Sequence, residues 1–192
     1  MLNKLRLKFF NRRIIQFHYF NIYHKFFCKK KPKELLTIAH HILGTGQLSL
    51  AKYLFIIDEE NAPDINNVQA FFIHFLERVD WNRDLHFLTK TTIDTLDYSS
   101  KKLNEGSKLI AAAAGEKKVE LANKVPNIKL SNDFNNVELV FNGVLAIDGI
   151  GSLNDLKTEL ENNILNQIRL IVYVDDAKYT SKDLSNWLWI CF

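Results

Sequence analysis

Cysteine is scarce in this chain, since Cys28 and Cys191 are the only two among its 192 residues. Two cysteines provide neither a framework of disulfide bonds nor the spacing of a cysteine-based metal site. Their scarcity fits a reduced compartment, and nothing in the sequence indicates secretion. We therefore expect a cytoplasmic protein.

Acidic residues are missing from the first part of the chain. Residues 1–33 contain ten Lys or Arg and no acid, whereas residues 34–192 contain 15 bases and 22 acids, a net charge of −7. Bases interrupt every apolar run of this arm, which excludes a membrane span there. Serine is also missing from the arm, and no small-residue cleavage site follows an apolar core, so it does not have the pattern of a targeting segment.

Three interpretations of the basic arm remain open. It could follow a nucleic-acid backbone while its Phe and Tyr side chains stack on bases. It could lie on an anionic membrane surface. It could also come from translation of DNA outside its proper frame, because Lys, Asn, Phe, Ile and Tyr dominate it and have A/T-rich codons.

The composition of the whole chain is that of a globular protein. Apolar residues make up 47% and charged residues 24%, which are ordinary values. A chain of this length forms one large domain or two small ones and buries roughly 70% of its unfolded surface.

Apolar periodicity and turn residues predict alternating strands and helices. We expect helices at 34–43, from Pro63-Asp64 to Arg78, from Ser152, where Asp155 completes a capping box, and at 182–192. The predicted strands are 52–57, 85–88, 109–114 and 170–174, with one or two more in 137–147, and residues 116–136 form a polar connector. This order predicts an α/β fold with a mostly parallel sheet flanked by helices.

One strand–helix unit occurs twice in the sequence. Residues 54–76 align with 171–192, so that Asp58 matches Asp175 and Glu59 matches Asp176. The second copy stops within its helix at the last residue of the chain. We therefore expect a truncated second unit and a chain that is a piece of a larger protein.

Gly106-Ser107-Lys108 is the first candidate site. Glycine lets the backbone approach a phosphate, serine provides a hydroxyl and lysine provides a positive charge. The alternative is a glycine turn with a solvated lysine, because a motif of three residues is a weak signal.

The other candidates have mainly structural interpretations. The repeated acidic turns at Asp58 and Asp175 favour turn formation and helix initiation over metal binding. Asp94 and Asp97 lie three residues apart in a loop, where a turn network is favoured over a substrate contact. The histidines lack acids or cysteines at metal-ligand spacing, and Gly44-Thr45-Gly46 lacks the preceding strand of a dinucleotide site. No catalytic nucleophile can be named.

Several motifs together resemble the C-terminal part of the UbiD family of decarboxylases. They are Lys52-Tyr53 before a strand and an acidic turn, a helix ending Arg78-Val79-Asp80, Arg83-Asp84, the run 93–97, and Gly106-Ser107-Lys108. Residues 30–192 share this resemblance, including the second copy, whereas residues 1–28 do not.

The resemblance implies a carboxy-lyase that decarboxylates an aromatic or α,β-unsaturated acid without oxidation, as in ubiquinone or menaquinone biosynthesis. It implies prenylated FMN as cofactor, with a divalent metal such as manganese and with potassium. The family's catalytic Glu–Arg–Glu set and metal ligands lie upstream of the matching part, so we expect no catalytic or metal-binding residue here.

One site carries over by resemblance: Lys108, with Gly106 and Ser107, is expected to contact the flavin phosphate. The domain prediction is a basic arm at 1–28, a UbiD-like α/β domain at 29–130 and a truncated second unit at 131–192. The expected partners are the missing N-terminal half or intact subunits, in a homo-oligomer that acts on an aromatic acid. The alternatives are an assembly module without activity and a nucleic-acid or membrane binder.

Overall fold

The computed structural model describes residues 6–9, 13–16, 34–58, 61–64, 66–94, 104–161 and 165–192. The chain divides into two compact units, which we call the central unit (His18–Lys118) and the terminal unit (Met1–Phe17 with Val119–Phe192). The predicted domain ranges, with boundaries at residues 28 and 130, stay a prediction.

The described residues form five α-helices and one 3-10 helix, η1 (Gly46–Leu50). The α-helices are α1 (Glu34–Leu43), α2 (Val68–Arg78), α3 (Leu153–Glu161), α4 (Ala177–Ser181) and α5 (Leu184–Cys191). The strands are β1 (Arg6–Phe9), β2 (Arg13–Gln16), β3 (Tyr53–Ile57), β4 (Leu85–Thr92), β5 (Glu105–Ala113), β6 (Phe134–Phe141), β7 (Val144–Gly149) and β8 (Leu170–Tyr173).

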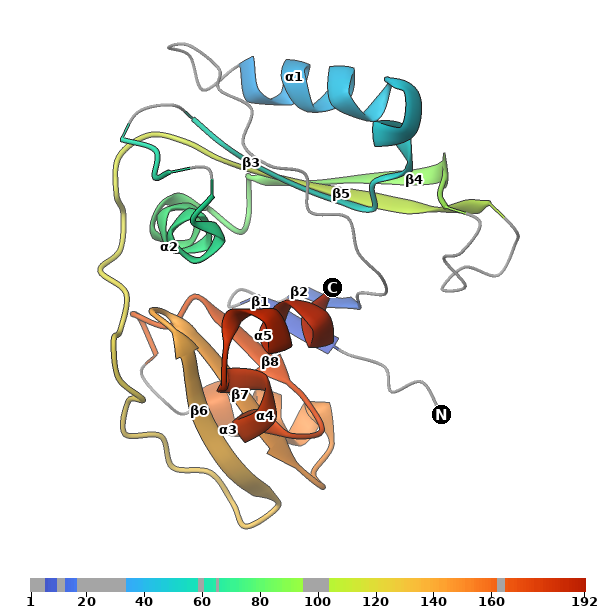
Figure 1. Ribbon diagram of the computed structural model, residues 1–192. Coiled ribbons are helices and arrows are strands. Elements are labelled where there is room, and N and C mark those ends of the chain that lie inside the picture. The colour runs from blue at the N-terminus through green and yellow to red at the C-terminus, as the bar shows by residue number, and fades with distance from the viewer. Residues whose placement is uncertain are drawn as a thin grey trace. The chain divides into compact units, whose positions relative to one another are not determined.

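The central unit contains a three-stranded sheet in the order β3-β5-β4, in which β3 is parallel and β4 antiparallel to β5. Helices α1 and α2 cover its opposite faces (Figure 1). Leu54 and Ile56 join the apolar cluster of α1, whereas Phe55 contacts Phe72 and Phe75 of α2. Alternate side chains of β3 thus point to opposite faces, which explains why every residue of this strand is buried.

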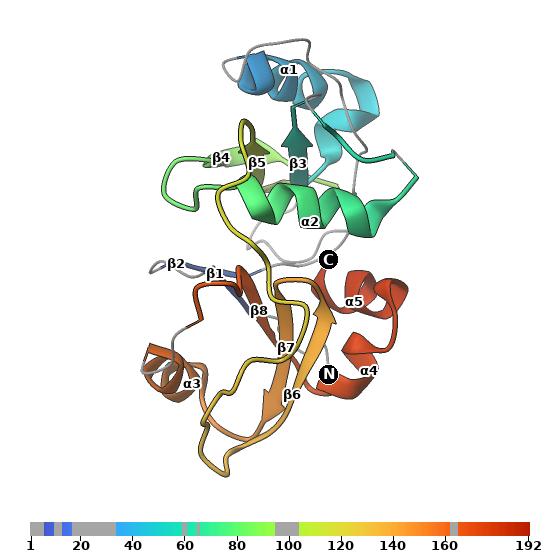
Figure 2. The ribbon, with the colours of Figure 1, turned by 90° about the vertical axis from the view of Figure 1, so that its left-hand side faces the viewer.

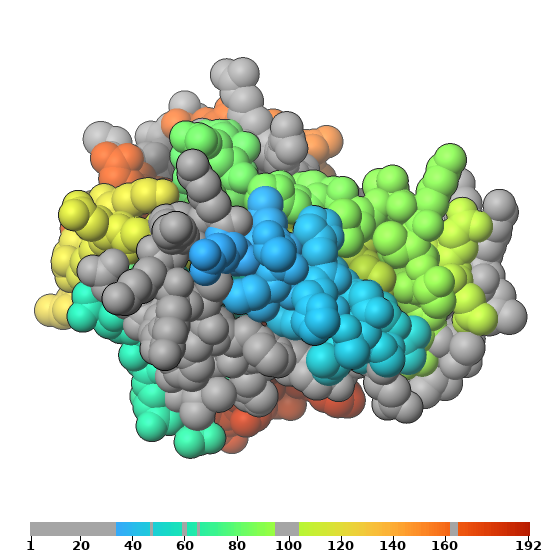
Figure 3. Space-filling model, turned by 90° about the horizontal axis from the view of Figure 1, so that it is seen from above, coloured from blue at the N-terminus to red at the C-terminus, as the bar shows by residue number. Residues whose placement is uncertain are grey.

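Part of the central unit's surface is formed by α1 and β4, which Figure 3 shows on one face of the molecule. Leu88 of β4 packs against the apolar cluster beneath α1. Phe87, the neighbouring side chain along the strand, is 43% exposed.

The terminal unit contains the sheet order β2-β1-β8-β7-β6. Here β7 and β8 are parallel, and β6 is antiparallel to β7. Helix α3 lies on one side of these strands and α4 and α5 on the other (Figure 2). Trp187 of α5 is fully buried and makes edge contacts with Phe141 and Phe192.

The prediction of a mostly parallel sheet is wrong. Among the described strands, the parallel pairs are β3–β5 and β7–β8, whereas β1–β2, β1–β8, β4–β5 and β6–β7 are antiparallel. The reason is local: the described residues place no helix between β4 and β5, and Asn142-Gly143 alone joins β6 to β7. Gly143 has a φ of 76°, which this tight turn needs.

Several local predictions are confirmed. The first helix covers residues 34–43 as expected. Ser152 and Asp155 form the capping box, since the Asp155 N–H donates to Ser152 Oγ and the Ser152 N–H donates to Asp155. Asp176 caps α4 through a 2.8 Å hydrogen bond from the Tyr179 N–H, in agreement with helix initiation at the second acidic turn.

Candidate functional site

The carboxyl ends of β3 and β5 meet at one edge of the central sheet. Asp58 follows β3, and its Oδ2 accepts a 2.7 Å hydrogen bond from the backbone N–H of Gly115, which follows β5. Gly115 has a φ of 87°, a conformation that suits glycine. Because α/β proteins usually bind ligands beyond the carboxyl ends of parallel strands, the groups around this pair are candidates for a site.

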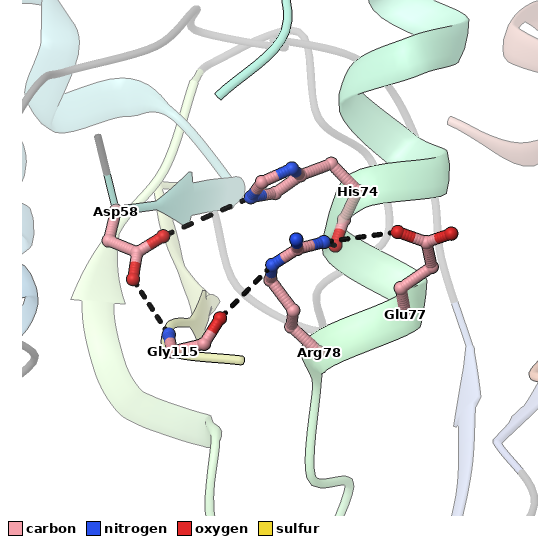
Figure 4. Close-up of polar contacts among 5 residues, drawn as sticks. All are labelled: Asp58, His74, Glu77, Arg78 and Gly115. Carbon is pink, nitrogen blue, oxygen red and sulfur yellow. Dashed lines mark hydrogen bonds and ion pairs between the residues drawn. The ribbon is translucent and has the colours of Figure 1, made fainter. Parts of the chain in front are cut away.

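Arg78 at the end of α2 completes the network shown in Figure 4. Its Nε donates to the Gly115 carbonyl at 3.1 Å, and one terminal nitrogen donates to the His74 carbonyl and to Glu77, each at 3.1 Å. Glu77 also pairs with Lys117 at 2.8 Å. Although Arg78 is only 8% exposed, its charge is therefore balanced, as a buried guanidinium requires.

His74 approaches the same carboxylate from α2. Its Nε2 lies 3.9 Å from Asp58 Oδ1. Burial lowers the pKa of His74 below its ordinary value of 6.5, and Arg78 lowers it further, whereas Asp58 and Glu77 raise it. The imidazole is therefore neutral at pH 7.

Lys108 lies within β5 and not in a turn. It is 5% exposed, and its Nζ donates a 3.0 Å hydrogen bond to the Ala51 carbonyl. It is therefore not the solvated lysine of the alternative interpretation. Because Lys108 is at the start of the parallel β3–β5 pairing and Asp58 is beyond its end, the structure does not bring these two residues together.

Gly106 and Ser107 also belong to β5. A Cβ on Gly106 would lie 2.7 Å from Ile93 Cδ1, so close packing accounts for this glycine. Ser107 is exposed while Lys108 is buried, as alternation along a strand requires. These residues thus offer one cationic donor and no cradle of backbone N–H groups, and their role in cofactor binding stays a prediction.

The remaining candidates form no metal site in the described residues, where no group of three or more His, Cys, Asp or Glu is placed to hold an ion. His40 and His41 are exposed on α1, and His86 lies on β4. Glu59, Glu60 and Asp97 lie outside the described residues. The role of Asp58 in joining two strand ends was missed, although its position after a buried strand was the available signal.

Comparison with known proteins identifies the family. Residues 17–113 match the UbiD C-terminal domain, described as the 3-octaprenyl-4-hydroxybenzoate carboxy-lyase C-terminal domain. The chain belongs to this carboxy-lyase family.

The curated relatives are bacterial. A protein of Chlamydia pneumoniae, named as a subunit of 4-hydroxybenzoate decarboxylase, is 34% identical over 162 residues, and an uncharacterized protein of Chlamydia muridarum is 32% identical over 160. Each match covers 83% of this chain and 27% of the relative. The chain thus spans about a quarter of the length of the relatives that it matches.

Two solved structures have weak similarity to this chain. The UbiD-class enzyme HmfF of Pelotomaculum thermopropionicum, solved with FMN, has a TM-score of 0.40 and 20% identity over 45% of this chain and 18% of that chain. The vanillic acid decarboxylase of Sedimentibacter hydroxybenzoicus has a TM-score of 0.39 and 19% identity over 52% of this chain and 21% of that chain.

Within the described parts of this chain, no helix combines the length and apolar character needed to cross a membrane.

Proposed function

We propose that the chain is the C-terminal part of a UbiD-like carboxy-lyase and is inactive by itself. The assembled enzyme would decarboxylate an aromatic or α,β-unsaturated acid without oxidation, in the cytoplasm and in quinone biosynthesis. The family match over residues 17–113 is the observation that carries this proposal. The name of the Chlamydia pneumoniae relative supports an aromatic acid as the substrate.

The proposal requires a partner. The chain corresponds to 27% of that relative, and the described residues contain no cluster for a divalent metal. Catalysis needs the cofactor, the metal and the acid–base groups held together. We therefore propose that these are supplied by an upstream half or by intact subunits, and that the complete enzyme is a homo-oligomer.

Lys108 is the residue that we propose for the cofactor phosphate in the complete enzyme. When bound there, prenylated FMN supplies a ring that accepts electrons as carbon dioxide leaves. The ammonium group of Lys108 is buried and donates to the Ala51 carbonyl, and the resemblance of the Gly-Ser-Lys motif to that of the family supports its role at the phosphate. Its proposed task is to add one positive charge at the phosphate, whereas Ser107 would contribute its hydroxyl group and Gly106 would lie beside the phosphate without a side chain.

Reconstitution tests the proposal. The chain is produced together with the part of the Chlamydia pneumoniae protein that precedes the match, in cells that make prenylated FMN, and carbon dioxide release from 4-hydroxybenzoate is measured. We expect activity from the pair and none from either part alone. Turnover by the chain alone, or an inactive pair that copurifies as a folded, flavin-loaded complex, would contradict the proposal.

The Lys108→Ala variant tests the cofactor contact in the same complex. Losing a hydrogen bond to a charged group should weaken flavin binding by about 1.5–3 kcal/mol. Lys118→Ala is the control, because Lys118 is exposed in the same unit. Equal flavin affinities of the two variants would show that Lys108 does not bind the cofactor. The family assignment would not be affected.

A second candidate function is an assembly module without activity of its own. Trp189 on α5 is 75% exposed and Ile150 is 86% exposed, and large exposed apolar side chains are typical anchors of protein interfaces. Light scattering of the purified chain tests this candidate. An oligomer that the double variant Ile150→Ser, Trp189→Ser converts to a monomer supports it, and a monomeric wild type contradicts self-assembly.

A further inference from the structure

Two buried polar atoms of the central unit face each other without hydrogen bonds. Asp58 Oδ1 and His74 Nε2 lie 3.9 Å apart, and neither atom has a hydrogen-bond partner among the described residues. The Asp58 and His74 side chains are only 13% and 7% exposed. Because a hydrogen bond between nitrogen and oxygen spans about 2.7–3.2 Å, the gap is about 1 Å too long.

The protonation state of the imidazole determines whether this gap can be bridged by a hydrogen bond. A neutral histidine carries one hydrogen, on Nδ1 or on Nε2. If the hydrogen is on Nδ1, Nε2 presents a lone pair to the carboxylate of Asp58, and the two acceptors do not attract each other. Protonation adds a hydrogen to Nε2 and makes a charge-assisted hydrogen bond to Oδ1 possible.

We infer that His74 and Asp58 form a proton-controlled latch, in which uptake of one proton at Nε2 closes the gap to Oδ1 and moves α2 relative to the carboxyl end of β3. The proton comes from solvent and returns to it on opening, and the N–H bond at Nε2 is the one covalent bond that is made and broken. Nothing in the proposed decarboxylase function requires this latch.

The same network connects the latch to β5. The other carboxylate oxygen of Asp58 accepts the Gly115 N–H at 2.7 Å, and the Gly115 carbonyl accepts from Arg78 at 3.1 Å. A movement of the Asp58 carboxylate toward His74 must therefore change the Gly115 hydrogen bond. Gly115 is the reporter of the latch, because it has no titratable side chain.

The surrounding charges set the open state at neutral pH. His74 faces Asp58 beyond β3 and both Glu77 and Arg78 on its own helix, and Glu77 is shared with Arg78 and Lys117. Burial and Arg78 hold the pKa of His74 below its ordinary value, against the opposing effects of Asp58 and Glu77. The latch is therefore open at pH 7 and closes on acidification.

Nuclear magnetic resonance of the full-length, ¹⁵N-labelled chain tests this directly. The side-chain nitrogens of His74 and the backbone amide of Gly115 are followed from about pH 8 to about pH 4.5, a range that spans the titration of histidine. We expect the Nδ1–H tautomer at the alkaline end and a Gly115 amide shift with the same midpoint as His74. An Nε2–H tautomer at the alkaline end, or a Gly115 amide that does not respond while His74 titrates, would overturn the latch.

Two variants distinguish the latch from other effects of low pH on the protein. Asp58→Asn keeps an acceptor for the Gly115 N–H but removes the charge, so the midpoint of His74 should fall and the Gly115 response should disappear. His41→Gln is the control, because His41 is exposed on α1, and it should leave both readouts unchanged. If Asp58→Asn does not fold, the wild-type titration alone decides, because its two readouts come from the unaltered chain.

Discussion

Asp58 accepts a hydrogen bond from the Gly115 N–H across 57 positions of sequence. Asp148 makes a similar contact in the terminal unit, where its Oδ2 accepts the Ala177 N–H at 2.8 Å. In each unit, a carboxylate near the end of one parallel strand binds backbone beyond its parallel neighbour. In each parallel pair, a carboxylate thus pairs a backbone N–H beyond the carboxyl end of the neighbouring strand, and in the terminal unit this N–H belongs to the buried Ala177.

Asp58→Ala should lower the free energy of unfolding by about 1.5–3 kcal/mol, because it removes a charged acceptor and leaves the Gly115 N–H unpaired. Urea denaturation followed by circular dichroism measures this. The exposed neighbour Glu116 supplies the control variant Glu116→Ala, which should change stability by less than about 0.5 kcal/mol. Similar unfolding midpoints for both variants would show that the contact does not stabilise the fold.

Two tryptophans on α5 provide a matched pair. Trp187 is fully buried against Phe141 and Phe192, whereas Trp189 is 75% exposed. Trp187→Ala should cost about 3–5 kcal/mol, since it leaves a cavity in the core. Trp189→Ala should stay within about 0.5 kcal/mol. The same denaturation experiment compares them, and a smaller loss for Trp187→Ala than for Trp189→Ala would contradict the packing of this helix.

The pH dependence of stability should reveal His74. The pKa of His74 is lowered in the folded protein from an ordinary value of 6.5. The unfolded chain therefore binds the proton more tightly than the folded chain, and protonation favours unfolding. The stabilising contribution is therefore complete above pH 6.5 and is lost as pH falls through the lowered pKa of the folded state.

Unfolding free energies measured from about pH 7.5 to about pH 5 check this dependence, because the ordinary histidine pKa lies within that range. The wild type should lose more stability over this range than His74→Gln, while His41→Gln should follow the wild type. Parallel curves for the wild type and His74→Gln would show that the pKa of His74 is not lowered by folding. The slope is the readout, so a constant stability offset between the proteins does not affect it.

Local patterns were sufficient to predict most elements but not their pairing. The helix at 34–43 has the expected bounds, and β3 starts one residue after the predicted strand. The antiparallel direction of β6 was also predictable, because Asn142-Gly143 between two apolar runs is a hairpin signal, which the prediction did not use. By contrast, the pairing of β1 with β8 joins opposite ends of the sequence, as in Arg6 with Tyr173, and no local signal indicates it.

The candidate site shows the same limit. Sequence identified Lys108 through a glycine-containing motif, but its burial and its bond to the Ala51 carbonyl depend on the pairing of β5 with β3. Likewise, the network of Asp58, His74 and Arg78 combines a strand end with two positions on a helix. The sequence favoured a helix-surface role for His74, which is wrong because this side chain is only 6% exposed. Neither its burial nor the carboxylate that it faces can be predicted from the apolar periodicity of α2.

The glycine of the Gly106-Ser107-Lys108 motif has two explanations, which are close packing against Ile93 and close approach to a phosphate. Variants of Gly106 can distinguish them. A Cβ at this position would meet Ile93 Cδ1 at 2.7 Å and Cγ2 at 2.9 Å, and Ile93 is 2% exposed. Gly106→Ala should therefore cost about 1–3 kcal/mol through overpacking. Ile93→Val removes Cδ1, which relieves the closest contact. The double variant Gly106→Ala, Ile93→Val should therefore lose less unfolding free energy than the two single variants together, by at least about 0.5 kcal/mol. Denaturation of the four proteins measures this coupling, and strictly additive losses would show that Gly106 is not required by its contact with Ile93.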